Sequence, residues 1–322
     1  MIRNQWYAIL ESKNVKKGRI TGARRLGENL ALWRTGNNEI ACIANKCVHR
    51  GASLSAGKII KDNLQCPFHG LQYDAHGKVV LIPANGKAQP VADYYKVASY
   101  TTKESHDFIW IFWGDKTDNL PELPFFKDID QSFSYITTVS PWPMHYTRCI
   151  ENQLDVAHLP FVHSTTIGSG NDTVVNGPII KINGNELFVW PYNEKEKNQI
   201  PLDADKLPVP DEDRFHLQFK FPNIWQNWIS KNLRVFISFT PVDEDNTILY
   251  LRSYQNFIRI PIIRQLVNFI IRIFDNKILM QDRKVVITQI PKKSELKMGE
   301  KLIKADGPIL KYREIRERLK SI

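Results

Sequence analysis

The sequence has few cysteines and no long uncharged apolar run, and both shortages narrow what the protein can be. Four cysteines in 322 residues are too few for a small secreted domain held together by disulfides. The start of the chain shows no apolar segment of the signal-peptide kind, so we expect a cytoplasmic protein. In that reducing compartment, spaced cysteines and histidines bind metals more often than they form disulfides.

One apolar stretch, residues 257–279, is the best candidate for contact with a membrane. Five charged residues interrupt it: Arg259, Arg264, Arg272, Asp275 and Lys277. A plain spanning helix needs about 20 consecutive apolar residues with few charges, so we do not expect this stretch to cross a bilayer. Its pattern favours a buried amphipathic helix over a helix lying at a membrane interface, and we expect no membrane association.

Secondary-structure patterns divide the chain into two parts. The first 115 residues contain short strand candidates separated by turn signals. The second part mixes strand candidates with helical stretches. We expect strands at residues 215–221, 235–240 and 248–254, and helices at residues 147–159 and 262–289. We therefore predict an all-β domain over residues 1–115 and an α+β domain over residues 116–322.

Two short segments each hold one cysteine and one histidine beside a glycine. Cys47-Val-His49-Arg-Gly precedes Cys66-Pro-Phe-His69-Gly, and sixteen residues separate His49 from Cys66. A zinc finger usually keeps its two cysteines on one arm and its two histidines on the other, whereas these arms are mixed. The mixture suits a Rieske [2Fe–2S] cluster, in which one iron has two thiolates and the other has two imidazoles. The alternatives are a structural zinc site or two unrelated pairs.

A second group of potential metal ligands lies further along the chain. His158 and His163 are five residues apart, or about 140° around a regular helix, so they can reach one metal only if the chain changes course at Pro160. Asn152, Asp155 and His158 form a loose stripe at i, i+3 and i+6. We expect Asp155 to orient His158 and Asn152 to lie near the same metal. Two histidines and one carboxylate would make a non-haem Fe(II) site.

These motifs resemble those of the Rieske non-haem iron oxygenases. The first pair of segments looks like the Rieske motif of that family, although many members carry Trp where this chain has Leu71. The run Asp155-x2-His158-x4-His163 is similar to the motif that supplies the family's two iron-binding imidazoles. The chain is short for a dihydroxylating α-subunit and looks more like the compact group of vanillate, dicamba, pheophorbide and saxitoxin-type oxygenases.

The resemblance implies an N-terminal Rieske domain followed by a helix-grip (START-like) catalytic domain with an antiparallel sheet. It indicates Asp282, on a late helix, as the carboxylate ligand of the iron, with Asp275 as the second choice. By family pattern, electrons pass from His69 of one subunit through Asp155 to His158 of the next. The resemblance therefore implies a homotrimer.

The implied function is that of the oxygenase component of a multicomponent monooxygenase. Such an enzyme uses O₂ and electrons from NAD(P)H to hydroxylate or oxidatively demethylate a small aromatic or polycyclic substrate. The sequence has no GxGxxG or flavin motif, so a separate ferredoxin and/or flavin reductase must deliver the electrons. The alternatives are a ring-hydroxylating dioxygenase and a pure Rieske electron-transfer protein.

Positive charge exceeds negative charge, with 44 Lys and Arg against 34 Asp and Glu and a formal net charge of +10. No recognised nucleic-acid fold and no stacking platform among basic residues accompanies this excess, so we expect no nucleic-acid partner. We interpret the charge as a docking surface for an acidic ferredoxin or reductase, or as an aid to solubility. Of the remaining candidates, Cys42 and Cys149 are expected to be small buried side chains, and His216 is expected at the surface or in a pocket.

Overall fold

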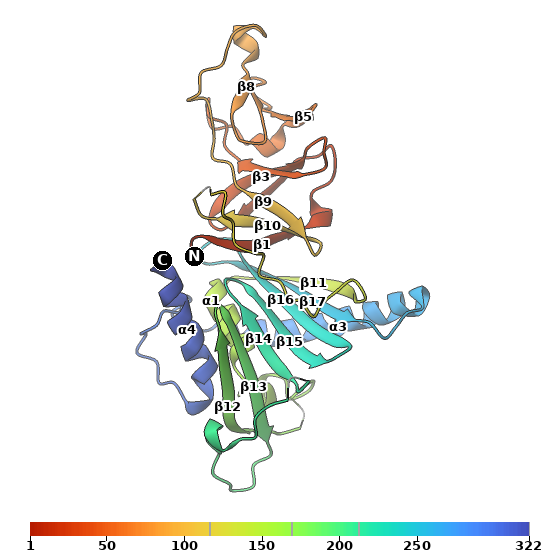
Figure 1. Cartoon of the computed structure of the whole chain (residues 1–322), viewed down its shortest axis with the longest axis vertical. Helices are drawn as coiled ribbons and strands as arrows, with labels where there is room; N and C mark the ends of the chain where they lie inside the picture. The colour runs from red at the N-terminus through yellow and green to blue at the C-terminus, as the bar shows by residue number, and fades with distance from the viewer. Residues whose placement is uncertain (116, 169, 212, 322) are drawn as a thin grey trace. The chain divides into compact units, whose positions relative to one another are not determined.

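The computed structural model describes residues 1–115, 117–168, 170–211 and 213–321, and the chain forms two compact units (Figure 1). One unit contains Arg3–Glu122 and the other contains Leu123–Ile322. The predicted domain boundary, residue 116, lies outside the described residues. Each unit has its own antiparallel sheets.

The first unit is built from three small antiparallel sheets. Their strands, in sheet order, are β1 (Gln5–Glu11), β10 (Phe108–Trp113) and β9 (Thr102–Ser105); β2 (Thr21–Arg25), β3 (Glu28–Arg34) and β4 (Ile40–Ala44); and β5 (Lys58–Ile60), β6 (Asn63–Gln65), β7 (Gln72–Tyr73) and β8 (Val79–Leu81). The five consecutive residues of β10 from Phe108 to Phe112 are buried, so both faces of the strand are covered, which explains its unbroken run of hydrophobic residues. The prediction of an all-β first part is confirmed.

The second unit is a seven-stranded antiparallel sheet with helices packed on it (Figure 1). The strands, in sheet order, are β11 (Ser134–Trp142), β17 (Thr247–Gln255), β16 (Leu233–Pro241), β15 (Ile224–Ser230), β14 (His216–Lys220), β13 (Glu186–Glu194) and β12 (Val174–Asn183). The long helix α3 (Pro261–Val286) lies against β11 and β17, while α4 (Gly307–Lys320) lies against β12 and β13. The α+β fold predicted for this part is confirmed.

The predicted helix over residues 147–159 is wrong in its second half. Helix α1 runs over Tyr146–Leu154, and the single-turn helix α2 begins at Leu159. Between them Asp155 has an extended backbone, with φ −72° and ψ 126°, and its Oδ1 accepts a 2.7 Å hydrogen bond from the backbone N–H of Ala157. Such an Asx turn competes with helical hydrogen bonding. The predicted stripe on one helical face is therefore absent, because His158 lies beyond the end of α1.

The expectation of a buried helix at residues 257–279 is also wrong for the first half of α3, where residues 261–274 are exposed or half-buried. The buried residues of α3 begin at Asp275 and continue with Leu279, Asp282 and Val286. One face of the first four turns carries large apolar side chains that are exposed to solvent. In the described part of the chain, no helix has the length and apolar character needed to cross a membrane.

Candidate metal centres

The two cysteine–histidine segments of the first unit form a matched pair of loops. The N–H of Gly51 donates to the carbonyl of Cys47, and the N–H of Gly70 donates to the carbonyl of Cys66. Both glycines have a positive φ, +74° and +73°, which favours glycine over residues with a side chain. The N–H of each cysteine in turn donates to the residue five positions later, Ala52 or Leu71. The two loops thus present their side chains in the same way.

The two loops bring the four predicted cluster ligands together, and the cysteines differ from the histidines in their exposure to solvent. Cys47 and Cys66 are buried, whereas His49 and His69 are exposed and their ring centroids lie 4.6 Å apart. Burial raises the pKa of the Cys66 thiol, and the neighbouring Cys47 thiol raises it further. A pair of adjacent thiols beneath a pair of adjacent imidazoles is the donor set that a Rieske cluster needs.

Tyr73 adds a contact that the sequence alone did not indicate. Its Oη lies 3.1 Å from Sγ of Cys47 and accepts a hydrogen bond from the backbone N–H of Val48. Burial and the nearby thiol raise the pKa of this phenol, so its proton stays in place. Hydrogen bonds to the sulfur atoms of an iron–sulfur cluster tune its reduction potential. The alternation of β7 places Tyr73 inward, but its reach to Cys47 depends on how the loop folds back.

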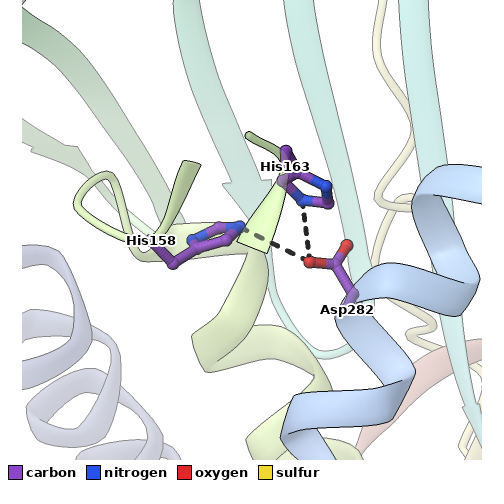
Figure 2. A group of neighbouring side chains, drawn as sticks. All are labelled: His158, His163 and Asp282. Carbon is purple, nitrogen blue, oxygen red and sulfur yellow. Dashed lines mark ion pairs between the residues drawn. The ribbon is translucent and has the colours of Figure 1, made fainter. Parts of the chain in front are cut away.

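Three side chains of the second unit converge from two distant parts of the chain (Figure 2). His158 and His163 flank the single turn of α2, while Asp282 lies on α3. Nε2 of His163 lies 2.9 Å from Oδ1 of Asp282, and Nε2 of His158 lies 3.5 Å from the same oxygen. Each of the three residues offers one potential ligand atom, and these three atoms lie within 4.8 Å of one another. Two imidazoles and one carboxylate are the donor set of a mononuclear non-haem iron site.

The turn of α2 is what brings the two histidines to one side. The backbone N–H groups of Val162 and His163 donate to the carbonyls of His158 and Leu159, so the chain completes one tight turn between the two imidazoles. Pro160 sits in the first turn of this short helix, where its missing N–H is tolerated. The change of course expected at Pro160 is therefore supplied by the break at residues 155–158 together with this turn.

Each histidine has a second partner that leaves its Nε2 directed at Asp282. Nδ1 of His158 lies 3.8 Å from Oδ2 of Asp155, an ion-pair distance longer than a direct hydrogen bond. Nδ1 of His163 lies 2.9 Å from Oε1 of Gln281. Partners of this kind set the tautomer and the orientation of a metal-binding imidazole. The sequence did not indicate Gln281, although it directly precedes Asp282.

Electrostatics favour positive charge at the centre of this group. Burial opposes ionisation of His158, but Asp155 and Asp282 outweigh it and raise its pKa to about 9. Burial likewise opposes ionisation of Asp282, yet the two imidazoles hold its pKa well below the usual range. A metal ion competes with these protons for the same nitrogen and oxygen atoms. The residues present therefore suit a divalent cation.

Two other candidates for the metal site, Asp275 and Asn152, are not among the three converging residues. Asp275, the second choice for the iron ligand, is buried seven residues before Asp282 and accepts a 2.8 Å hydrogen bond from Ser253. Burial raises its pKa to about 6, and it is not among the three residues that converge. Asn152 lies in α1, and its buried Nδ2 has no hydrogen-bond partner among the described residues. The geometry thus favours Asp282 over Asp275.

The remaining sequence candidates are not members of the triad. Cys42 and Cys149 are buried, as predicted. His216 is also buried, where its ring lies between those of Trp190 and Trp228 at centroid distances of 5.5 Å each. The three residues line a cavity of about 270 Å³. His216 therefore lies in a pocket, one of the two places expected for it.

Comparison with known families assigns both units. Residues 5–101 match the Rieske [2Fe-2S] domain, and residues 142–321 match the vanillate O-demethylase oxygenase C-terminal domain. The chain belongs to the Rieske non-haem iron oxygenases. Membership implies both a Rieske cluster and a mononuclear iron, and the two donor sets described above fit those groups.

Individual relatives extend the similarity over different lengths. The chain is 31% identical to Protein TIC 55 of Pisum sativum over 50% of its own length, but the alignment covers only 30% of that relative. It is 26% identical to the methylxanthine N1-demethylase NdmA of Pseudomonas putida, covering 99% of this chain and 89% of NdmA.

Solved structures show the same fold. A structure of NdmA from Pseudomonas putida superposes with a TM-score of 0.81 at 22% identity, covering 99% of this chain and 91% of that one. Dicamba monooxygenase bound to dicamba superposes with a TM-score of 0.75 at 20% identity, covering 100% and 98%. The helix-grip arrangement predicted for the second unit is confirmed by these superpositions.

Proposed function

We propose that this protein is the oxygenase component of a multicomponent monooxygenase. It hydroxylates or oxidatively demethylates a small organic substrate, with O₂ as co-substrate and electrons from NAD(P)H supplied by a separate ferredoxin and/or flavin reductase. The observation that carries the proposal is the convergence of His158, His163 and Asp282 within 4.8 Å. A Rieske electron carrier needs no such second centre.

The second unit would hold iron through those three residues. Iron bound by one face of ligands keeps positions open for O₂ and supplies the oxidising power of the reaction. The chain itself orients both imidazoles through Asp155 and Gln281 and keeps the carboxylate of Asp282 ionised. It also buries His163 and Asp282 away from bulk water.

The first unit would hold the cluster through Cys47, His49, Cys66 and His69. Because the thiols are buried and the imidazoles are exposed, the histidine edge is the face through which electrons can enter and leave. We propose that electrons leave through His69 of one subunit and reach His158 of the next through Asp155, in a homotrimer. The position of Asp155 beside His158 supports this route.

The substrate class rests on relatives. NdmA is a methylxanthine N1-demethylase, and a relative from Rhizorhabdus wittichii, 32% identical over 52% of this chain, is the oxygenase component of a chloroacetanilide N-alkylformylase. Both names describe removal of a group from nitrogen on a small ring compound. We therefore place N- and O-alkyl aromatic compounds first among the substrates to test. We also propose that the enzyme acts in the cytoplasm.

Reconstitution tests the proposal. The purified protein, loaded with iron and cluster, is supplied with NADH and a flavin-dependent ferredoxin reductase, and a panel of N-methyl and O-methyl aromatic compounds is screened. We expect O₂ consumption coupled to formaldehyde or an alcohol product. His158→Ala should abolish turnover and leave the spectrum of the cluster unchanged. Formation of cis-diols would instead identify a dioxygenase, and turnover retained in His158→Ala would contradict an iron-dependent oxygenase.

A further inference from the structure

The first half of helix α3 presents an apolar face that its own sheet does not cover. Ile262, Leu266, Phe269 and Ile273 are spaced at i, i+4, i+7 and i+11, so they form one stripe along the helix. Their exposed fractions are 80%, 62%, 61% and 58%. A stripe on a surface helix that borders water is normally polar.

The exposed stripe is part of a wider apolar surface. Five further large apolar side chains beside it or just before α3 are also exposed, namely Phe257, Ile260, Ile263, Ile270 and Phe274. Single exposed apolar residues are common on soluble proteins, but a contiguous group of this kind marks a surface that meets a partner or a membrane. We call these nine residues the α3 apolar face.

The charged residues in the segment that carries the α3 apolar face are all positive. Residues 256–274 contain three arginines and no aspartate or glutamate. Two of them, Arg259 and Arg264, line an open cavity of about 810 Å³ at the start of the helix. Its other lining residues include the polar side chains of Ser134, Gln255 and Asn256. An apolar helix face beside an arginine-lined polar cavity matches the two chemical layers of a membrane surface, acyl chains below and phosphate headgroups above.

We propose that the first half of α3 is an interfacial anchor for an anionic lipid bilayer. The α3 apolar face lies in the boundary between headgroups and acyl chains, while Arg259 and Arg264 bind lipid phosphate groups. Amphipathic helices with basic residues and bulky apolar side chains bind membranes in this orientation, and anionic lipids attract arginines near the surface. The earlier expectation of no membrane contact depended on this helix being buried.

A two-fold dimer through the α3 apolar face suits its charges less well than a membrane does. In a two-fold interface the same patch meets itself. Arg259, Arg264 and Arg272 would then face like charges, and residues 256–274 offer no acid to pair with them. An anionic lipid surface supplies the missing negative charge.

Vesicle flotation tests the anchor with the iron- and cluster-loaded full chain. Two probes are compared, vesicles of pure phosphatidylcholine and vesicles of equimolar phosphatidylcholine and phosphatidylglycerol. We expect flotation with the anionic vesicles and little with the neutral ones, and a loss of bound protein as salt is raised. Failure to float with the anionic vesicles would overturn the proposal.

Matched variants locate the binding surface. The double variant Leu266→Asp and Phe269→Asp should lower the partition coefficient on anionic vesicles at least ten-fold, and Arg259→Gln with Arg264→Gln should lower it several-fold. Ile200→Asp changes an apolar residue that is 88% exposed outside the face and should have no effect. Circular dichroism and iron content check folding. If the first double variant instead reduces the oligomer mass measured by light scattering, and wild type binds no vesicles, the face is an interface between copies.

Discussion

Oε1 of Gln281 lies 2.9 Å from Nδ1 of His163, and Gln281 directly precedes the proposed iron ligand Asp282 in the sequence. The same oxygen accepts a 2.9 Å hydrogen bond from Oγ1 of Thr166, and Nε2 of Gln281 donates to Thr165. One residue of α3 therefore fixes the orientation of an imidazole that comes from α2, while its neighbour supplies the carboxylate. The adjacent residues Gln281 and Asp282 thus connect α3 to the histidines around α2 in the proposed iron site.

Gln281→Leu should weaken iron binding while leaving the fold intact. Loss of the acceptor frees the His163 ring to rotate and to change tautomer, and partners of this kind are worth roughly 10- to 100-fold in metal affinity. The measurement is the residual iron content during titration with a chelator. Gln281→Glu, which keeps an acceptor oxygen, should retain most of the affinity. Equal iron retention in wild type and Gln281→Leu would contradict an orienting role.

Asp155→Asn should leave both metal centres loaded but slow electron transfer between them. The side chain keeps its shape, and its Oδ1 can still accept from the N–H of Ala157. What changes is the second oxygen, Oδ2, which faces His158 at 3.8 Å and becomes an uncharged amide. In a single turnover with substrate and O₂, the cluster should stay reduced. Rapid reoxidation coupled to product formation would exclude the bridging role.

The ligand residues could be predicted from the sequence because the relevant information is local. Cys47, His49, Cys66 and His69 sit at fixed spacings beside glycines, and the φ of Gly51 explains why glycine is there. The two parts of the fold follow from where strand patterns give way to mixed patterns. Antiparallel pairing and sheet order then follow from packing of the whole chain.

Contacts between side chains that are far apart in the sequence cannot be predicted from the sequence alone. The sequence does not indicate Gln281, because nothing in its immediate neighbourhood shows that it points at His163, 118 residues away. The helix expected through residue 159 ends early because Asp155 satisfies a backbone N–H with its own side chain. The apolar pattern of residues 257–279 favours a buried helix on sequence alone, since periodicity reports a hydrophobic face without saying what covers it.

Arg313→Met should destabilise the second unit strongly. Nε and Nη2 of Arg313 on α4 bind the carboxylate of Glu151 on α1 at 2.8 and 3.1 Å, and both side chains are buried. Arg148 would remain as a partner of Glu151, but removal of one member of a buried ion pair typically costs about 3–5 kcal/mol. Urea unfolding followed by circular dichroism measures the change. Arg318→Met, at an exposed position of the same helix, should change stability by less than about 0.5 kcal/mol.

His145 should make the second unit sensitive to acid. It caps α1, where its Nδ1 accepts a hydrogen bond from the backbone N–H of Thr147. Burial, assisted by Arg316 and Lys293, lowers its pKa to about 3. The folded protein thus keeps this imidazole neutral, whereas the unfolded chain protonates it below about pH 6.5.

The sign of the pH effect follows from that difference. Between about pH 6.5 and pH 3 the unfolded state binds the extra proton, so each unit of pH decrease removes about 1.4 kcal/mol from the free energy of unfolding. His145→Asn keeps a favoured capping side chain without a titrating group. On going from pH 7 to pH 5, we expect the variant to lose about 2 kcal/mol less stability than wild type in urea titrations of the loaded protein. Groups that titrate in both proteins cancel in this comparison, so equal losses would show that the histidine is protonated in the folded state.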